Sequence, residues 1–178
     1  MRVAIAGGHG QIALRLAKIM SERGDEVVAL IRNPDHADEV RDAGAEPAVV
    51  DLEHASEDEV ANAINGSDAV VFAAGAGPGS GSERKETMDY GGAVKLIAAA
   101  KQAGVGRYVI VSSMGANPSA TGDDTFSVYL RAKGQPAALY VRMGNSTRQL
   151  AVDEAMTYSL DRWGRRAVRR ASAPHGHA

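Results

Sequence analysis

The stretch VAIAGGHGQIA, residues 3–13, decides the fold. An apolar run typical of a buried strand leads into a glycine loop, where Gly7 and Gly10 allow a tight turn and a close approach of the backbone to a ligand. From Gln11 onward, apolar residues beginning with Ile12 recur at helical spacing. A helix that starts here directs its free N–H groups and positive dipole end towards the space above the strand. The stretch therefore predicts a strand, turn and helix that hold a nucleotide pyrophosphate.

The composition is that of one globular domain of 178 residues with a net charge of −2 and no cysteine. The lack of cysteine excludes disulfides and thiol chemistry. No apolar segment approaches the ~20 residues that cross a membrane, and the first residues do not resemble a signal peptide. We therefore expect a cytoplasmic protein without a membrane partner, and the acidic charge argues against nucleic acid as a partner.

Strand-like and helix-like segments alternate over the first 113 residues. The strand-like segments are residues 3–6, 27–31, 47–50, 69–74 and 108–112, and the helix-like segments are residues 11–22, 35–43, 56–65 and 86–103. This alternation predicts a Rossmann-like α/β fold, a doubly wound parallel sheet of five or six strands with right-handed crossovers. The glycine-rich residues 75–82 follow the fourth strand and are either a loop at the ligand-binding carboxyl edge or a plain linker.

Arg32 ends the second strand, where NAD-binding domains carry an acidic residue for the ribose 2′-hydroxyl. A guanidinium suits a 2′-phosphate, so we predict that NADP(H) is preferred over NAD(H); the alternative is a solvated arginine. Asp51 and Leu52 follow the third strand and are predicted at the adenine edge, although Asp51 could equally be a cap or turn residue. Small residues at the end of the fourth strand allow close approach to a ribose, namely Ala73, Ala74 and Gly75.

Tyr129 and Lys133 are four residues apart, which places them on one face of a helix. A neighbouring ammonium group favours the phenolate form of a tyrosine, so the phenol becomes a usable proton donor to a carbonyl. Ser113, at the end of the fifth strand, could hold the same carbonyl oxygen. We predict that Ser113, Tyr129 and Lys133 are the catalytic residues, and we expect no metal site.

Five motifs in combination resemble the atypical short-chain dehydrogenase/reductase superfamily, in particular its NAD(P)H-binding NmrA-like and biliverdin-reductase-B-like branch. They are GGHGQI (7–12), ALIRNP (29–34), DYGG (89–92), GRYVIVSSMG (106–115) and YLRAK (129–133), and the resemblance covers residues 1 to about 135. It implies a Rossmann fold with strand order 3-2-1-4-5. It also implies cofactor contacts from Gly7, Gly10, Gln11, Ile12 and Arg32, and it matches Ser113, Tyr129 and Lys133 to the superfamily's catalytic trio. The trio is often incomplete in this branch.

The chain departs from this family after Lys133. Pro136 is expected to end the helix, and residues 139–143 have the pattern of a strand, either a sixth strand or part of an unrelated tail. Residues 1–136 are acidic, whereas the remainder has an excess of arginine. We expect an NAD(P)-binding Rossmann domain at 1–145, a basic helical extension at 146–170 and a disordered tail at 171–178. A missing late strand would leave a free sheet edge that invites a homodimer.

The predicted function is an NADPH-dependent oxidoreductase that reduces a small carbonyl or quinone-like compound, with Tyr129 as proton donor. Two alternatives remain open from the sequence. One is a non-catalytic NADP(H)-binding redox sensor, and the other is an altered, inactive member of the family. The sequence does not name the substrate.

Overall fold

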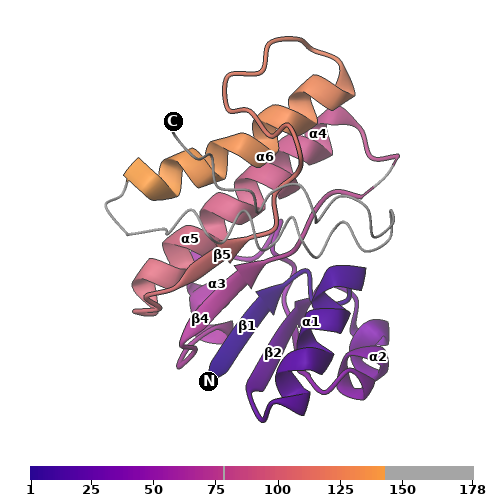
Figure 1. Cartoon of the computed structure of the whole chain (residues 1–178), viewed down its shortest axis with the longest axis vertical. Helices are drawn as coiled ribbons and strands as arrows, with labels where there is room; N and C mark the ends of the chain where they lie inside the picture. Colours follow the sequence, from indigo (N-terminus) through magenta and orange to yellow (C-terminus); the bar gives the residue numbers. More distant parts are fainter. Residues whose placement is uncertain (78, 143–178) are drawn as a thin grey trace, which may run out of the picture.

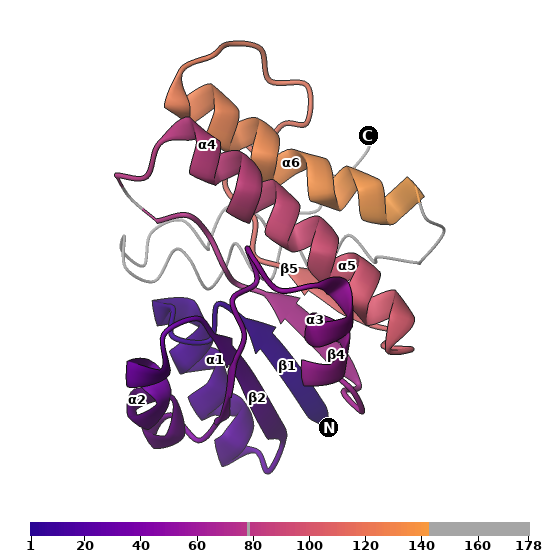
Figure 2. The same ribbon diagram turned by 180° about the vertical axis from the view of Figure 1, so that it is seen from behind.

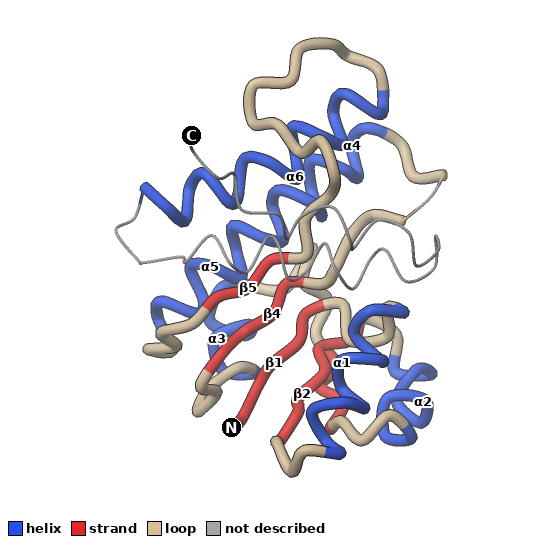
Figure 3. The backbone as a smooth tube through the Cα atoms, viewed as in Figure 1, coloured by secondary structure: helices blue, strands red, loops and turns tan. Residues whose placement is uncertain are grey.

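The computed structural model describes residues 1–77 and 79–142 and contains a sheet of five parallel strands between helices (Figures 1 and 3). The strands are β1 Arg2–Ala6, β2 Glu26–Ile31, β3 Glu46–Val49, β4 Ala69–Phe72 and β5 Tyr108–Ile110. Their order in the sheet is β3-β2-β1-β4-β5, and all four pairings are parallel. The predicted Rossmann-like fold and strand order are therefore confirmed.

Helices occupy each crossover between strands. They are α1 Gln11–Glu22, the 3-10 turn η1 Pro34–His36, α2 Ala37–Asp42, α3 Glu57–Ala63, α4 Ser82–Arg84, the π-helix η2 Lys85–Gly92, α5 Ala93–Gln102 and α6 Thr125–Arg142. Local sequence explains where they start. At α3, for example, the Ser56 hydroxyl accepts the Glu59 N–H while the Glu59 carboxylate accepts the Ser56 N–H, which is a capping box.

The sheet is covered on both faces, because successive apolar side chains of each strand point to opposite sides. Val3 and Ile5 of β1 pack with α1 and α2, whereas Ala4 and Phe72 pack with α3 and α5. Figures 1 and 2 show these two helix layers on either side of the strands. Helix α6 lies alongside η2 and α5. The carboxyl ends of the strands meet at one edge, where the loops converge.

The prediction that Pro136 ends the helix is wrong, because α6 continues through it to Arg142. Proline removes one backbone donor from a helix, but the Pro136 ring is fully buried and α6 packs along η2, so tertiary packing offsets the lost hydrogen bond. Residues 139–142 are therefore helical, and the described residues contain no sixth strand.

The other C-terminal predictions concern residue 143, the extension at 146–170 and the tail at 171–178, which lie outside the described residues. Within residues 1–77 and 79–142, none of the helices combines the length and hydropathy that a membrane crossing requires.

Candidate cofactor and active site

The glycine turn after β1 is built by close backbone contacts. Gly10 N–H donates to the Gly7 carbonyl at 2.8 Å, and Gly7 has a φ of +79°. A Cβ at Gly7 would lie 2.6 Å from the Ala74 Cα, so the turn and the end of β4 fit together only without a side chain at that position. The turn delivers the chain to the first turn of α1, whose N–H groups face the carboxyl edge of the sheet.

A cavity of about 350 Å³ lies beside this turn, and we call it the Arg32 cavity. Eight of its lining residues were predicted to contact a cofactor: Gly7, Gly10, Arg32, Asp51, Leu52, Ala73, Ala74 and Gly75. Of the other two, Ile12 lines a neighbouring cavity, whereas Gln11 is exposed and lines neither. The Arg32 side chain is 56% exposed, and its Nη1 lies 3.8 Å from the Glu53 Oε2. Its guanidinium is therefore accessible to an anion.

Glu53 holds several groups around the Arg32 cavity, although sequence reasoning did not single it out. Its Oε2 accepts hydrogen bonds from Arg84 Nη2 at 3.2 Å and Nε at 3.3 Å, and its Oε1 accepts one from the Thr87 hydroxyl at 2.6 Å. Burial raises the pKa of Glu53, but the hydrogen bonds from Thr87 and Arg84 outweigh it, so the pKa lies below its ordinary value. Arg84 is thereby fixed in the lining of the Arg32 cavity.

Asp51 combines the two roles that the sequence left open. It lines the Arg32 cavity, and it is also a turn residue, because its Oδ1 accepts the Glu53 N–H at 3.0 Å and its Oδ2 lies 2.9 Å from His54 Nδ1. Partial burial raises the pKa of Asp51, but the hydrogen bonds with His54 and Glu53 together outweigh this effect, so the pKa lies below its ordinary value. The carboxylate is thus held in its ionised form.

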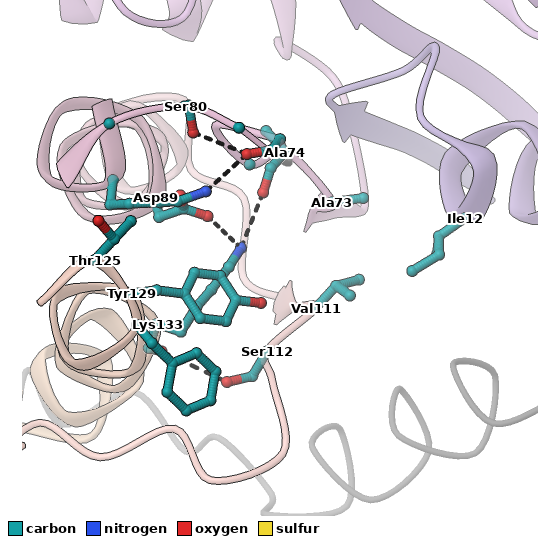
Figure 4. A pocket seen from close by; sticks show the side chains of 16 residues that line it. Ile12, Ala73, Ala74, Ser80, Asp89, Val111, Ser112, Thr125, Tyr129 and Lys133 are labelled. Atoms are coloured by element: carbon teal, nitrogen blue, oxygen red, sulfur yellow. Dashed lines mark hydrogen bonds and ion pairs between the residues drawn. The ribbon is translucent and has the colours of Figure 1, made fainter. Parts of the chain in front are cut away.

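A second cavity of about 920 Å³ lies at the same edge and is called here the Tyr129 cavity (Figure 4). It is lined by α1, the glycine-rich loop after β4, η2, the residues that follow β5, and α6. Figure 4 shows Ile12 on the opposite side of this space from Tyr129 and Lys133. The strands β4 and β5 end two residues earlier than predicted, so residues 73–74 and 111–112 lie beyond the sheet and face the cavity.

Lys133 is anchored by a buried carboxylate. Its Nζ lies 2.8 Å from Asp89 Oδ1 and donates to the Ala74 carbonyl at 3.1 Å. Asp89 Oδ2 accepts the Ala76 N–H at 3.2 Å, which ties the glycine-rich loop to η2. Asp89 lies within the DYGG motif, but no feature of the sequence linked it to Lys133. Sequence reasoning therefore missed Asp89.

Tyr129 has a cation and an aromatic ring as neighbours. Lys85 Nζ lies 5.4 Å from the centroid of the Tyr129 ring, and the Phe126 ring centroid lies 6.4 Å from it. Tyr129 and Lys133 line the same cavity, as their helical spacing suggests. Lys85 was not predicted, because it belongs to a segment whose helix was expected to begin only at residue 86.

The two serines after β5 differ in position. Ser112 lines the Tyr129 cavity, and its hydroxyl donates to the Lys133 carbonyl at 3.5 Å. Ser113 is absent from the described lining, and its hydroxyl donates to the Met114 carbonyl at 3.1 Å. The structure therefore brings Ser112, and not Ser113, next to the predicted pair.

Comparison with known proteins agrees with this geometry, because residues 7–147 match the NAD(P)H-binding domain family. The chain belongs to this NAD(P)H-binding family. Its fold and its relatives place this NAD(P)H-binding protein among the atypical short-chain dehydrogenase/reductases, which confirms the resemblance seen in the sequence. Within the described residues, no group of three or more His, Cys, Asp or Glu side chains could hold a metal ion.

Three relatives illustrate the range of this NAD(P)H-binding group. The chain is 34% identical over 134 residues to the uncharacterized sugar epimerase YhfK of Bacillus subtilis, covering 75% of the chain and 62% of the relative. A solved structure from Bacillus halodurans, assigned as an NAD-dependent epimerase/dehydratase, is 36% identical with a TM-score of 0.69 and covers 78% and 63%. The oxidoreductase ylbE from Lactococcus lactis is 26% identical with a TM-score of 0.65 and covers 82% and 65%. The chain thus spans less than two thirds of each.

Proposed function

We propose that the protein is an NADPH-dependent reductase of a small carbonyl or quinone-like compound. The observation that carries this proposal is that the Arg32 cavity and the Tyr129 cavity share Ala73, Ala74 and Gly75 in their linings. One extended ligand can therefore reach from the arginine to the tyrosine. A bound nicotinamide cofactor would supply the hydride. Two of the similar structures are described as an NAD-dependent epimerase/dehydratase and as an oxidoreductase, which supports chemistry of this kind.

The residues that line the Arg32 cavity fit a dinucleotide that carries a 2′-phosphate. The glycine turn lines the Arg32 cavity and leads directly into α1, so a pyrophosphate bound there would lie at the N-terminus of this helix. Arg32 is accessible and Arg84 lines the same cavity, so two guanidinium groups can face a phosphate. Glu53 lies 3.8 Å from Arg32 and compensates their charge while no phosphate is bound.

The side chains of the Tyr129 cavity suit the transfer of a proton to the oxygen of the carbonyl group that is reduced. Tyr129 donates its phenolic proton to the oxygen of the acceptor as the carbon receives the hydride, and the phenol is later reprotonated from solvent. Lys133 is held beside it by Asp89 and stabilises the negative charge that develops on the phenol. The Ser112 hydroxyl lines the same cavity, and by rotating away from its 3.5 Å hydrogen bond to the Lys133 carbonyl it would donate to the acceptor oxygen.

The test is oxidation of NADPH by a panel of aldehydes, ketones and quinones, with Tyr129→Phe as the decisive variant. We expect kcat to fall by at least about 100-fold in Tyr129→Phe, with the Kd of NADPH changed by less than about twofold because the phenol is not needed for binding. Unchanged turnover would remove Tyr129 from the mechanism. Binding of NADPH without oxidation by any compound would favour a redox sensor, and interconversion of a sugar without net loss of NADPH would favour an epimerase.

A further inference from the structure

Lys85 is a buried cation that has no carboxylate partner within the part of the chain that the structure describes. The residue is 8% exposed, and its Nζ donates to the Gly77 carbonyl at 2.8 Å. No carboxylate of residues 1–77 or 79–142 lies within ion-pair distance of it. Since an ammonium removed from water is costly unless an anion compensates it, Lys85 is a candidate for binding an anion.

The charges around the Tyr129 cavity do not balance. Its described lining holds two ammonium groups, on Lys85 and Lys133, and one carboxylate, on Asp89. Asp89 is committed to Lys133 at 2.8 Å. The ammonium group of Lys85 is therefore available to pair with an anionic group of a molecule that enters the cavity.

Lys85 lies outside the lining of the Arg32 cavity, where we propose that the nucleotide phosphates bind. It lines the Tyr129 cavity and not the Arg32 cavity, and its Nζ lies 5.4 Å from the centroid of the Tyr129 ring. An anion bound by Lys85 therefore lies close to the proposed proton donor. This position favours the molecule to be reduced over the phosphates of a cofactor as the source of the anion.

An exposed aromatic ring lines the same cavity as this cation. Phe126 is 64% exposed and lines the same cavity, and its ring lies 6.4 Å from the Tyr129 ring at an interplanar angle of 29°. Val111 adds further apolar lining, and Ile12 lies on the opposite side of the cavity from Tyr129. An exposed aromatic ring at the wall of a cavity offers a face for a planar apolar group.

We propose that the acceptor reduced at Tyr129 is a planar carbonyl compound that bears a carboxylate, and that Lys85 pairs with this carboxylate while Phe126 contacts the planar body. The inference rests on the proposed function for the chemistry at Tyr129. The contact between Lys85 and the anion stands apart from catalysis and can be measured by binding alone.

The first experiment measures binding of benzoate and of uncharged benzamide to the full chain saturated with NADP⁺, by ligand-observed NMR titration. We expect benzoate to bind about 10- to 100-fold more tightly, the range of a charge-assisted hydrogen bond. Lys85→Met should abolish this preference and Lys85→Arg should retain most of it. Lys101→Met removes the same charge from an exposed position at the end of α5 and should retain the preference fully.

The second experiment compares kcat/KM for 4-carboxybenzaldehyde and 4-formylbenzamide. The wild-type protein should prefer the carboxylate by at least about tenfold, and the ratio should approach one in Lys85→Met. Thermal unfolding of each variant checks that it is folded. If Lys85→Met does not fold, the charge-retaining Lys85→Arg and the wild-type preference still decide the question.

The outcomes separate this inference from the proposed function. Equal binding of benzoate and benzamide by the wild type overturns the role of Lys85. A loss of NADPH affinity in Lys85→Met as large as the loss of benzoate affinity also overturns it, because Lys85 would then serve a cofactor phosphate. A benzoate preference that depends on Lys85, without oxidation of NADPH by any carbonyl, supports the anion site and contradicts the reductase.

Discussion

The Nζ atom of Lys133 lies 2.8 Å from the Oδ1 atom of Asp89, and this ion pair joins α6 to the π-helix η2. Both side chains are almost fully removed from solvent. The position of the lysine next to Tyr129 therefore depends on a residue from a different helix. The pair also contacts the end of β4, since Lys133 donates to the Ala74 carbonyl.

Breaking this pair should destabilise the fold. Lys133→Met leaves the Asp89 carboxylate buried without a counter-ion, and Asp89→Asn leaves the ammonium unpaired, so each should lower the free energy of unfolding by about 3–5 kcal/mol. The double variant should cost less than the sum, because neither charge then remains. Urea unfolding of the four proteins measures the coupling, and strictly additive losses would show that the pair contributes nothing as a pair.

Arg32→Ala should weaken binding of NADPH far more than that of NADH. The guanidinium is accessible, and a lost contact to a phosphate costs about 10-fold or more in affinity. Calorimetric titration of both cofactors measures the ratio. Arg23→Ala is the matched control, because Arg23 is exposed at the far end of α1. Equal losses for the two cofactors in Arg32→Ala would refute the assignment.

Glu53 predicts a dependence of stability on pH. Its pKa is lowered in the folded state, so its stabilising contribution is complete above the ordinary glutamate pKa of about 4.3 and is lost as pH falls through the lower folded value. Glu53→Gln should therefore be less stable than wild type at neutral pH, and the difference should shrink towards about pH 3. Urea unfolding at several pH values tests this. The exposed Glu83→Gln should show no such trend.

Two serine variants decide which hydroxyl serves the acceptor. Each hydroxyl donates to a backbone carbonyl, but only Ser112 is in the described lining of the Tyr129 cavity, and its hydrogen bond of 3.5 Å is the longer of the two. We expect Ser112→Ala to lower kcat/KM by about tenfold, the worth of one hydrogen bond to a developing charge, and Ser113→Ala to lower it less. Steady-state kinetics measure both. The reverse order would restore the role that the sequence alone gave to Ser113.

Gly7→Ala should be more harmful than a substitution at another glycine with positive φ. Gly24 has a φ of +81° and open space around it, so alanine there meets backbone strain of about 1–2 kcal/mol only. Alanine at Gly7 meets the same strain, and its Cβ would lie 2.6 Å from the Ala74 Cα. Thermal unfolding should therefore rank Gly7→Ala below Gly24→Ala. Equal stabilities would mean that the turn and β4 can move apart.

The sequence predicted every strand of the sheet, because each is a short apolar run bounded by turn residues. The glycine turn and Arg32 were found in the same way, since local spacing determines both. Pro136 shows the limit of such reasoning. A proline is a local signal against a helix, but burial of α6 against η2, which no local pattern reveals, outweighs it.

The site was only partly predictable for a similar reason. Tyr129 and Lys133 are neighbours on one helix, so their spacing brings them together. Asp89 and Lys85 reach the same cavity from η2, and only the packing of η2 against α6 brings them there. The choice between Ser112 and Ser113 depended on where β5 ends, and β5 ends two residues earlier than its apolar pattern suggested.

Ala73, Ala74 and Gly75 belong to the linings of both cavities, and none of them has a side chain larger than a methyl group. A compound that spans the two cavities must pass over these three small residues, whereas a shorter one fills a single cavity. The affinity of a ligand should therefore depend on its length. A mononucleotide such as AMP should gain the contacts of one cavity only, so its affinity compared with that of the full dinucleotide measures the contribution of the other cavity.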